Sequence, residues 1–312
     1  RPPRSTLFPY TTLFRSAVLR GKWFISFRDV EANQILVNLL LERGVENEDI
    51  TKLSDKSPIV VCAMSETEMK TGHDFSDAPQ DSVAIIGLQG SMLKYGSYCS
   101  YGTTEVAEMV NQAADSPKIS GILLDIDSGG GSVDAIAPLV DAIQYAQKKK
   151  KCVVAYCDLC ASAAYYVACY CDEIIASNTI SSEFGSIGVM MSFPDYAKYY
   201  ENVGVKVHTI YSNLSSYKNG PFEAAKEGKY DAIKTEELDP LARGFQEAVK
   251  NRRGSKLNLE TEGIIAGRMF YANDAKENGL IDSVGTRDFA LGRVRELRRD
   301  AYVNEYINSK SA

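Results

Sequence analysis

Histidine is scarce in this sequence, which has only two such residues among 312. His73 lies in a polar stretch, and His208 alternates with apolar residues in KVHTIY, a pattern that predicts a strand. A histidine that acts as a general base also needs an orienting carboxylate. The sequence therefore gives little support to a serine–histidine–aspartate triad, and a nucleophilic serine would need a different base.

Excess positive charge and long apolar runs are missing as well. The net charge of -6 argues against a nucleic-acid partner, because little would neutralise a run of phosphates. No uninterrupted apolar run reaches the roughly 18 residues of a membrane span, and no signal peptide is visible. We therefore expect a cytoplasmic protein. Membrane association stays open, because we expect the native N-terminus to be missing.

That expectation comes from residues 6–16, which read TLFPYTTLFRS. The string resembles a translated sequencing adapter, so we treat residues 1–16 as a non-native segment. Residues 17–81 are expected to form an N-terminal extension and linker, with a short strand in GKWFISF, a helix over 31–44 and a loop over 54–81. The main domain is expected over 82–290, followed by a charged helical tail over 291–312.

Cysteine occurs seven times, and an odd number fits a reducing compartment better than a disulfide framework. Four of these residues form a pattern that superficially resembles a zinc site: Cys157, Cys160, Cys169 and Cys171. They end a predicted buried strand and an apolar helix, where cysteine is typically a small buried residue. We therefore expect neither a metal nor a cofactor, and Cys160 is only a minor alternative nucleophile.

From residue 82 onward, apolar strands alternate with helical segments. The predicted strands cover residues 83–88, 121–127, 152–157, 173–177 and 187–191. The predicted helices cover residues 105–115, 132–147, 162–169 and 235–254. This alternation predicts an α/β fold with a parallel sheet covered on its faces.

Three segments carry candidate chemistry. The turn at 127–132 has three consecutive glycines before a helix, where free N–H groups can stabilise an oxyanion. Ser162 lies between a strand and a helix of small residues, where serine is most often an N-cap. Lys218 lies in a polar loop, where a lysine is usually solvated. Each segment alone has this ordinary interpretation.

Taken together, the segments resemble the signal peptide peptidase (SppA) family, which also contains phage capsid-maturation proteases. The matching order is GGG, ASAAYY, GSIGVM and YKNGPF, and the closing stretches are GRMFY and AKENGLID. The resemblance extends from about residue 83 to 285. It implies a ClpP/crotonase-like β-α superhelix with a small N-terminal extension. It also implies a homo-oligomeric ring, because family members complete their active sites near subunit contacts.

The resemblance also implies a role for five residues. Ser162 matches the nucleophile and Lys218 the general base of a serine–lysine dyad. The amides of Gly130 and Ala163 match the oxyanion donors, although alanine replaces the family's usual glycine at position 163. Ser186 matches a serine that holds the lysine in place. Lysine can act as a base because burial disfavours its ammonium form and lowers its pKa.

The leading hypothesis is therefore a serine endopeptidase that cleaves polypeptides through an acyl-enzyme. Processing of capsid or scaffold proteins in phage assembly is favoured by the absence of a membrane span, and membrane-associated degradation of signal peptides is the rival role. A crotonase-like acyl-CoA enzyme shares the fold but uses carboxylates instead of a serine. An inactive capsid component would have no use for Ser162 and Lys218.

Overall fold

The fold is known from a computed structural model, which describes residues 22–25, 59–62, 69–71, 75–96, 101–193 and 197–311. Its main sheet has the strand order β11-β9-β7-β5-β4-β2-β3, and β8 pairs with both β7 and β12. The central strands are parallel: β4 (Ser82–Gln89), β5 (Ile119–Ser128), β7 (Cys152–Ala161), β8 (Glu173–Ala176) and β9 (Glu183–Gly185). The predicted α/β class is confirmed.

Side chains along the central strands alternate between two covered faces. Ile122 and Leu124 of β5 belong to the larger core, which also contains residues of α3 (Thr103–Asp115), α4 (Ile136–Lys148) and α5 (Ala163–Ala168). Leu123, between them, faces a second core with Leu291 and Val294 of α10 (Arg287–Ser311). Burial on both faces explains why these strands are continuous apolar runs in the sequence.

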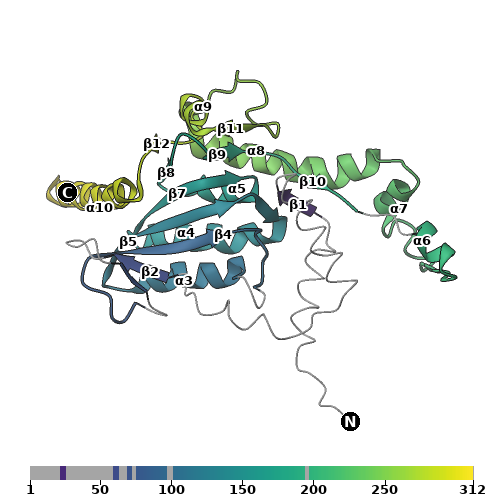
Figure 1. The fold of residues 1–312 in the computed structure, drawn as a ribbon, viewed down its shortest axis with the longest axis horizontal. Coiled ribbons are helices and arrows are strands. Elements are labelled where there is room, and N and C mark those ends of the chain that lie inside the picture. Colours follow the sequence, from purple (N-terminus) through teal and green to yellow (C-terminus); the bar gives the residue numbers. More distant parts are fainter. Residues whose placement is uncertain are drawn as a thin grey trace, which may run out of the picture.

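The remaining helices and strands lie around this sheet, most of them in the C-terminal part of the chain (Figure 1). The 3-10 helix η2 (Val133–Ala135) precedes α4, and the π-helix η3 (Ile233–Leu238) leads into α8 (Asp239–Arg253). The others are η4 (Gly254–Lys256), β11 (Met269–Tyr271), α9 (Ala272–Glu277) and β12 (Ser283–Val284). In the described ranges, no helix is both long and apolar enough to cross a bilayer.

A second, small sheet has the order β10-β1-β6. Its strands are β1 (Lys22–Ile25), β6 (Gly130–Ser132) and β10 (Met190–Met191). Both of its pairings are antiparallel, so β1 runs between two strands that come from distant parts of the main domain. The short strand predicted in GKWFISF is confirmed.

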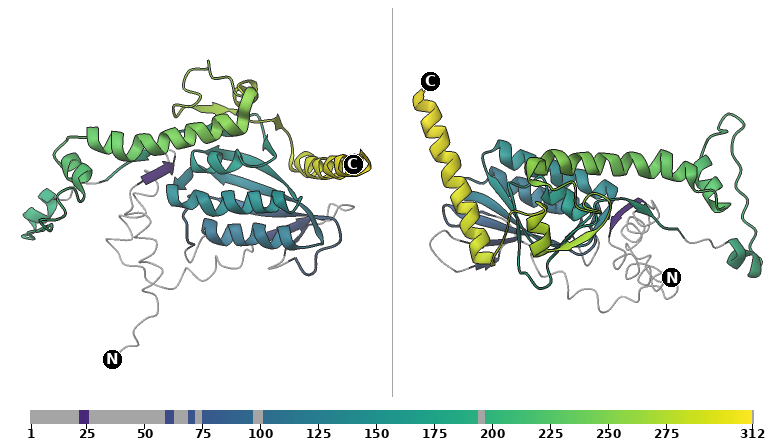
Figure 2. Two further views of the ribbon diagram at one scale, coloured as in Figure 1. Left: turned by 180° about the vertical axis from the view of Figure 1, so that it is seen from behind. Right: turned by 90° about the horizontal axis from the view of Figure 1, so that it is seen from above.

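Residues 197–230, which we call the arm, reach away from the sheet (Figure 2). The arm contains α6 (Ala197–Asn202) and α7 (Gly220–Lys226). Every residue from 201 to 214 is exposed. The predicted strand in KVHTIY is wrong, because this described segment has no regular structure and His208 lies in an exposed loop. Alternation alone does not form a strand where no neighbouring edge supplies hydrogen bonds.

Two other sequence-based expectations are corrected by the structure. The loop predicted over 54–81 contains β2 (Ile59–Cys62) and β3 (Met69–Thr71), because the apolar run IVVC extends the sheet beside β4. The strand predicted over 187–191 is reduced to its last two residues, which form β10 (Met190–Met191), and residues 187–189 are not in a strand. Three predictions fall outside the described residues: that residues 1–16 are non-native, that a helix covers 31–44, and that His73 lies in a polar loop. The helical tail is confirmed by α10.

Candidate active site

Ser162 lies at a sharp turn between β7 and α5. Its φ of 54° and ψ of -116° are unusual for a residue with a side chain, and such strain persists only where the surroundings enforce it. The Ser162 N–H donates to Gly185 O at 2.8 Å, and the Ser162 carbonyl accepts from the Tyr166 N–H at 2.9 Å. The backbone of Ser162 is therefore held from both sides.

The side chain of Ser162 does not cap α5. A serine N-cap normally has φ and ψ in the extended region and accepts a hydrogen bond from the first turn, and Ser162 does neither. The adjoining Ala161, Ala163 and Ala164 are fully buried. This arrangement resembles the strained strand-to-helix turn on which some hydrolases present a nucleophilic serine.

The glycine turn lies beside this helix, because β6 contacts α5. Gly130 has a φ of 101°, which favours glycine. The Gly130 N–H donates to Ser128 Oγ at 3.1 Å, and Ser128 Oγ donates to Gly90 O at 2.6 Å. A Cβ on Gly131 would lie 2.0 Å from Met92 O, so only glycine lets these two chain segments meet.

The segment around Ser186 borders the serine turn on its other side. Gly185, whose carbonyl accepts from Ser162, would place a Cβ 2.4 Å from Arg268 O. Ser186 has a positive φ of 53°, and its N–H donates to Arg268 O at 3.0 Å. Ala163 is the first residue of α5, where backbone N–H groups have no intrahelical partner. The structure thus gathers four of the predicted residues: Ser162, Ala163, Gly130 and Ser186.

Lys218 lies apart from this group. It is exposed in the arm, just before α7, and its backbone N–H donates to Ser215 O at 3.0 Å. The arm carries α7 away from α5 in both figures (Figures 1 and 2). Within the described part of the chain, no hydrogen bond joins the side chains of Ser162 and Lys218. A single copy therefore does not assemble the predicted dyad in this structure.

Asp158 was not singled out from the sequence, although it organises the loop that leads into β9. Its Oδ1 accepts from Ser177 Oγ, Asn178 Nδ2, Ser181 Oγ and Ser182 Oγ at 3.0–3.2 Å. This loop ends at β9, whose Gly185 binds the Ser162 N–H. A lone carboxylate within the apolar run CVVAYCDLCA was the signal that could have identified it.

A model of peptidase family S49 matches residues 144–300, about half of the chain. This chain belongs to peptidase family S49. The SppA resemblance is confirmed, and the parallel sheet agrees with the α/β class predicted from the sequence. The matched range contains Ser162, Ser186 and Lys218, whereas Gly130 precedes it.

Two relatives and one solved structure are among the proteins that are similar to this chain. Protease 4 of Haemophilus influenzae is 25% identical and covers 72% of this chain and 37% of its own length. The head-tail preconnector protein GP5 of Enterobacteria phage P21 is 32% identical, with 65% and 41% covered. A mutant of a membrane-bound stomatin-specific protease is 17% identical, with a TM-score of 0.36 and 70% and 85% covered. The chain spans less than half the length of these two relatives.

Three of the described cysteines of this S49 chain lie in the apolar core. Cys157, Cys160 and Cys169 are buried. Burial raises the pKa of Cys169 to about 12, and burial together with the neighbouring Cys160 raises the pKa of Cys157 well above its usual value. Both conditions disfavour the thiolate that binds metals or attacks carbonyls. In the residues described, no group of three or more metal-ligating side chains comes together.

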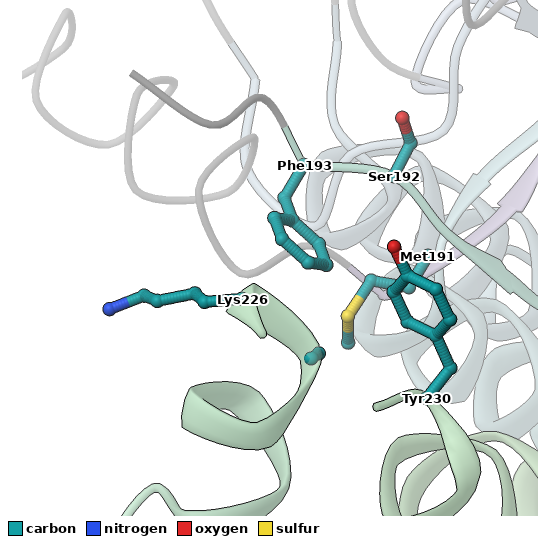
Figure 3. A pocket seen from close by; sticks show the side chains of 6 residues that line it. Met191, Ser192, Phe193, Lys226 and Tyr230 are labelled. Atoms are coloured by element: carbon teal, nitrogen blue, oxygen red, sulfur yellow. The ribbon is translucent and has the colours of Figure 1, made fainter. Parts of the chain in front are cut away.

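A pocket of about 340 Å³ opens between the end of β10 and the arm (Figure 3). Its apolar walls are Met191, Phe193, Ala225 and Tyr230, and Lys226 and Ser192 complete the lining. Phe193 also contacts Phe222 of α7, with ring centroids 4.9 Å apart. The pocket therefore joins the small sheet to the part of the chain that carries Lys218.

Proposed function

We propose that this chain is a serine endopeptidase in which Ser162 is the nucleophile and Lys218 the general base. The observation that carries the proposal is the strained turn at Ser162, whose side chain caps nothing and whose backbone is held by Gly185 and Tyr166. A structural serine has no need of such a conformation. Membership of a peptidase family supports the same reaction.

In the proposed mechanism, the neutral amine of Lys218 takes the proton of Ser162 Oγ as this oxygen attacks the scissile carbonyl. The resulting oxyanion collapses to an acyl-enzyme, and the lysine gives its proton to the leaving amine. The neutral amine of Lys218 then takes a proton from a water molecule as this water attacks the acyl-enzyme. The acyl group leaves as a carboxylic acid, and Ser162 Oγ regains its proton from Lys218. No metal or cofactor takes part in these steps.

The N–H groups of Ala163 and Gly130 are the proposed oxyanion donors. The Ala163 N–H begins α5, where a developing negative charge is favoured. The Gly130 N–H is shared with Ser128 Oγ at 3.1 Å, so binding of the oxyanion would replace this hydrogen bond. In this proposal Ser186 orients the lysine, as the resemblance to SppA implies.

We further propose that Lys218 serves the Ser162 of a neighbouring copy. Lys218 is exposed, whereas a lysine must be desolvated to lose its proton near neutral pH. The arm exposes the apolar side chains of Val205, Val207, Ile210 and Leu214. Their burial against a second copy would both stabilise a ring and desolvate the lysine.

Mixed assemblies distinguish this arrangement from a dyad within one chain. Ser162→Ala and Lys218→Ala, each expressed alone, should be inactive on a peptide substrate. When they are co-expressed in equal amounts, about a quarter of the sites in a ring combine an intact serine with an intact lysine from its neighbour. Hydrolysis should therefore recover to about a quarter of the wild-type rate.

A dyad within one chain predicts no recovery, because no copy then holds both groups. Lys218→Arg is the matched control for charge, since arginine stays protonated and cannot act as a base. Labelling with a fluorophosphonate should modify wild type at Ser162. Labelling elsewhere, or hydrolysis by Ser162→Ala, would show that another residue is the nucleophile.

For the biological role we favour processing of capsid or scaffold proteins in the cytoplasm of a bacterial host. The similarity to the phage P21 head-tail preconnector protein supports this role. Membrane-associated degradation of signal peptides is the alternative. A crotonase-like activity gains no support from Ser162, because crotonase-type enzymes use carboxylates for their chemistry.

A further inference from the structure

The small sheet places β1 between two strands that belong to the main domain. Trp23 lies opposite Ser132 of β6 on one side and Met190 of β10 on the other. Lys22 lies opposite Met191, and Phe24 lies opposite Gly131. Because β1 is antiparallel to both neighbours, β6 and β10 are parallel to each other. They form the two walls of a channel that holds one extended strand.

Both walls come from the segments that border Ser162. β6 begins at Gly130, inside the glycine turn, and contacts α5. β10 begins shortly after Gly185, whose carbonyl accepts the Ser162 N–H. In Figure 1, β1 accordingly lies close to β10 at the end of the sheet where β7 passes into α5. A strand in this channel therefore runs beside the candidate nucleophile.

The nucleophile itself is closed off, since Ser162 is only 1% exposed. A polypeptide substrate has to reach it, and extended peptides commonly bind by adding a strand to free backbone groups. In this structure the backbone groups of β6 and β10 already pair with β1. The channel cannot hold β1 and a second strand together.

We propose that the channel between β6 and β10 is a binding surface for an extended polypeptide and that β1 occupies it as an internal competitor. The incoming segment would run antiparallel to both walls, as β1 does. This inference rests on the proposed peptidase function, because it identifies the polypeptide that β1 excludes as the substrate. Release of β1 then limits access to Ser162.

The pocket in Figure 3 indicates the kind of segment that fits. Met191 pairs with Lys22 and also lines the pocket. Beyond Met191, the antiparallel register carries an incoming chain past Phe193 towards Ala225 and Tyr230 on its N-terminal side. The occupant therefore places a side chain in this pocket, whose lining is both polar and apolar, on the N-terminal side of the residues that pair with β10.

Phe24→Pro tests the competition in the full-length chain. Proline removes a backbone N–H and is disfavoured in a central strand, so β1 should leave the channel. If β1 fills the channel in about nine of ten molecules, kcat/KM for a leucine- and alanine-containing octapeptide should rise about tenfold through a lower KM. Phe24→Ala keeps the N–H and should stay near wild type.

The single tryptophan of the chain, Trp23, lies in β1 and provides a readout that needs no catalysis. In Ser162→Ala, titration with the tryptophan-free octapeptide should shift the emission maximum of Trp23 towards that of Phe24→Pro and saturate. The inference would be overturned if wild type cleaves the octapeptide but the emission maximum of Trp23 in Ser162→Ala does not change when this peptide is added. A Phe24→Pro variant that loses melting temperature without any fall in KM would also overturn it.

The two proposals fail in different ways. If wild type and Phe24→Pro both lack hydrolysis while the octapeptide still shifts Trp23, the channel binds peptides and the proposed peptidase function is wrong. If wild type cleaves the octapeptide but Phe24→Pro has an unchanged KM and an unchanged spectrum, β1 is an ordinary structural strand.

Discussion

Backbone strain occurs at the serine turn and also beside Lys218 in the arm. In the described part of the chain, five non-glycine residues have a positive φ, and Ser162, Ser186 and Asn219 are three of them. Ser162 and Ser186 flank the hydrogen bond from the Ser162 N–H to Gly185 O, and Asn219 follows Lys218. Each such conformation costs about 1–3 kcal/mol and persists only where the fold enforces it. A catalytic geometry is a physical reason for the fold to do so.

Asp282 illustrates a residue whose importance is structural. It accepts hydrogen bonds from Arg253 at 3.0 Å, from Lys256 at 2.8 Å and from the Ile174 N–H at 2.8 Å. Burial by itself raises the pKa of Asp282, but the hydrogen bonds and charge of Arg253 outweigh it and hold the pKa below its ordinary value. The pair fastens the C-terminal part of the chain to β8.

We predict that Asp282→Asn lowers the free energy of unfolding by about 3–5 kcal/mol at pH 7, because the buried Arg253 loses its counter-charge. A lowered carboxyl pKa stabilises the fold above the unfolded-state value and loses this effect as the pH falls through the folded-state value. The difference in unfolding free energy between wild type and Asp282→Asn should therefore become smaller below about pH 4. Urea denaturation of both proteins from pH 7 to pH 3 measures this difference.

Asp300→Asn is the matched control, since the Asp300 side chain is 64% exposed on α10. It should leave the unfolding free energy unchanged across this range. If Asp282→Asn were still less stable than wild type by the same unfolding free energy at pH 3, the role assigned to the ionised carboxylate would be contradicted.

At the level of elements, the loop between β8 and β9 links Asp158 to the serine turn. We predict that Asp158→Ala lowers the melting temperature and slows fluorophosphonate labelling of Ser162, because four hydrogen-bond donors lose their acceptor. The loss of stability should be about 1–3 kcal/mol. Asp158→Asn keeps one side-chain oxygen and should restore much of both properties.

The labelling rate separates positioning from simple destabilisation. Asp141→Ala, on the exposed surface of α4, should change neither the melting temperature nor the labelling rate. If Asp158→Ala melts earlier but labels as fast as wild type at a temperature where both are folded, Asp158 stabilises the loop without positioning the nucleophile.

At the scale of the whole molecule, the arm is the feature that a single copy does not explain. Leu214 is 97% exposed and Ile210 is 91% exposed. We predict that Leu214→Glu leaves the melting temperature of the dissociated chain unchanged but reduces assembly and hydrolysis together, because a carboxylate would be buried between copies. Light scattering coupled to size-exclusion chromatography, with a parallel activity assay, measures both.

Ile180→Glu provides the comparison, since Ile180 is 87% exposed but lies in the loop between β8 and β9. It should leave assembly intact. An assembled and fully active Leu214→Glu variant would exclude the arm from the proposed subunit contact.

The sequence by itself determined the elements whose information is local. The apolar runs of β4, β5 and β7 predict buried parallel strands, and helical spacing predicts α3, α4 and α8, because both patterns depend on near neighbours in the chain. The strand in GKWFISF was predicted from its composition. The order of the S49 motifs was also visible in the sequence. These features needed no knowledge of distant contacts.

The tertiary structure alone decided which segments meet. The IVVC run became a strand because β4 offered an edge, whereas KVHTIY had no such edge and stayed irregular. The Gly130 N–H donates to Ser128 Oγ, and β1 pairs with β6 and β10. Lys218, predicted beside Ser162, lies instead in an exposed arm. Pairing across the fold depends on which backbone groups and surfaces are left over, and no local pattern records that.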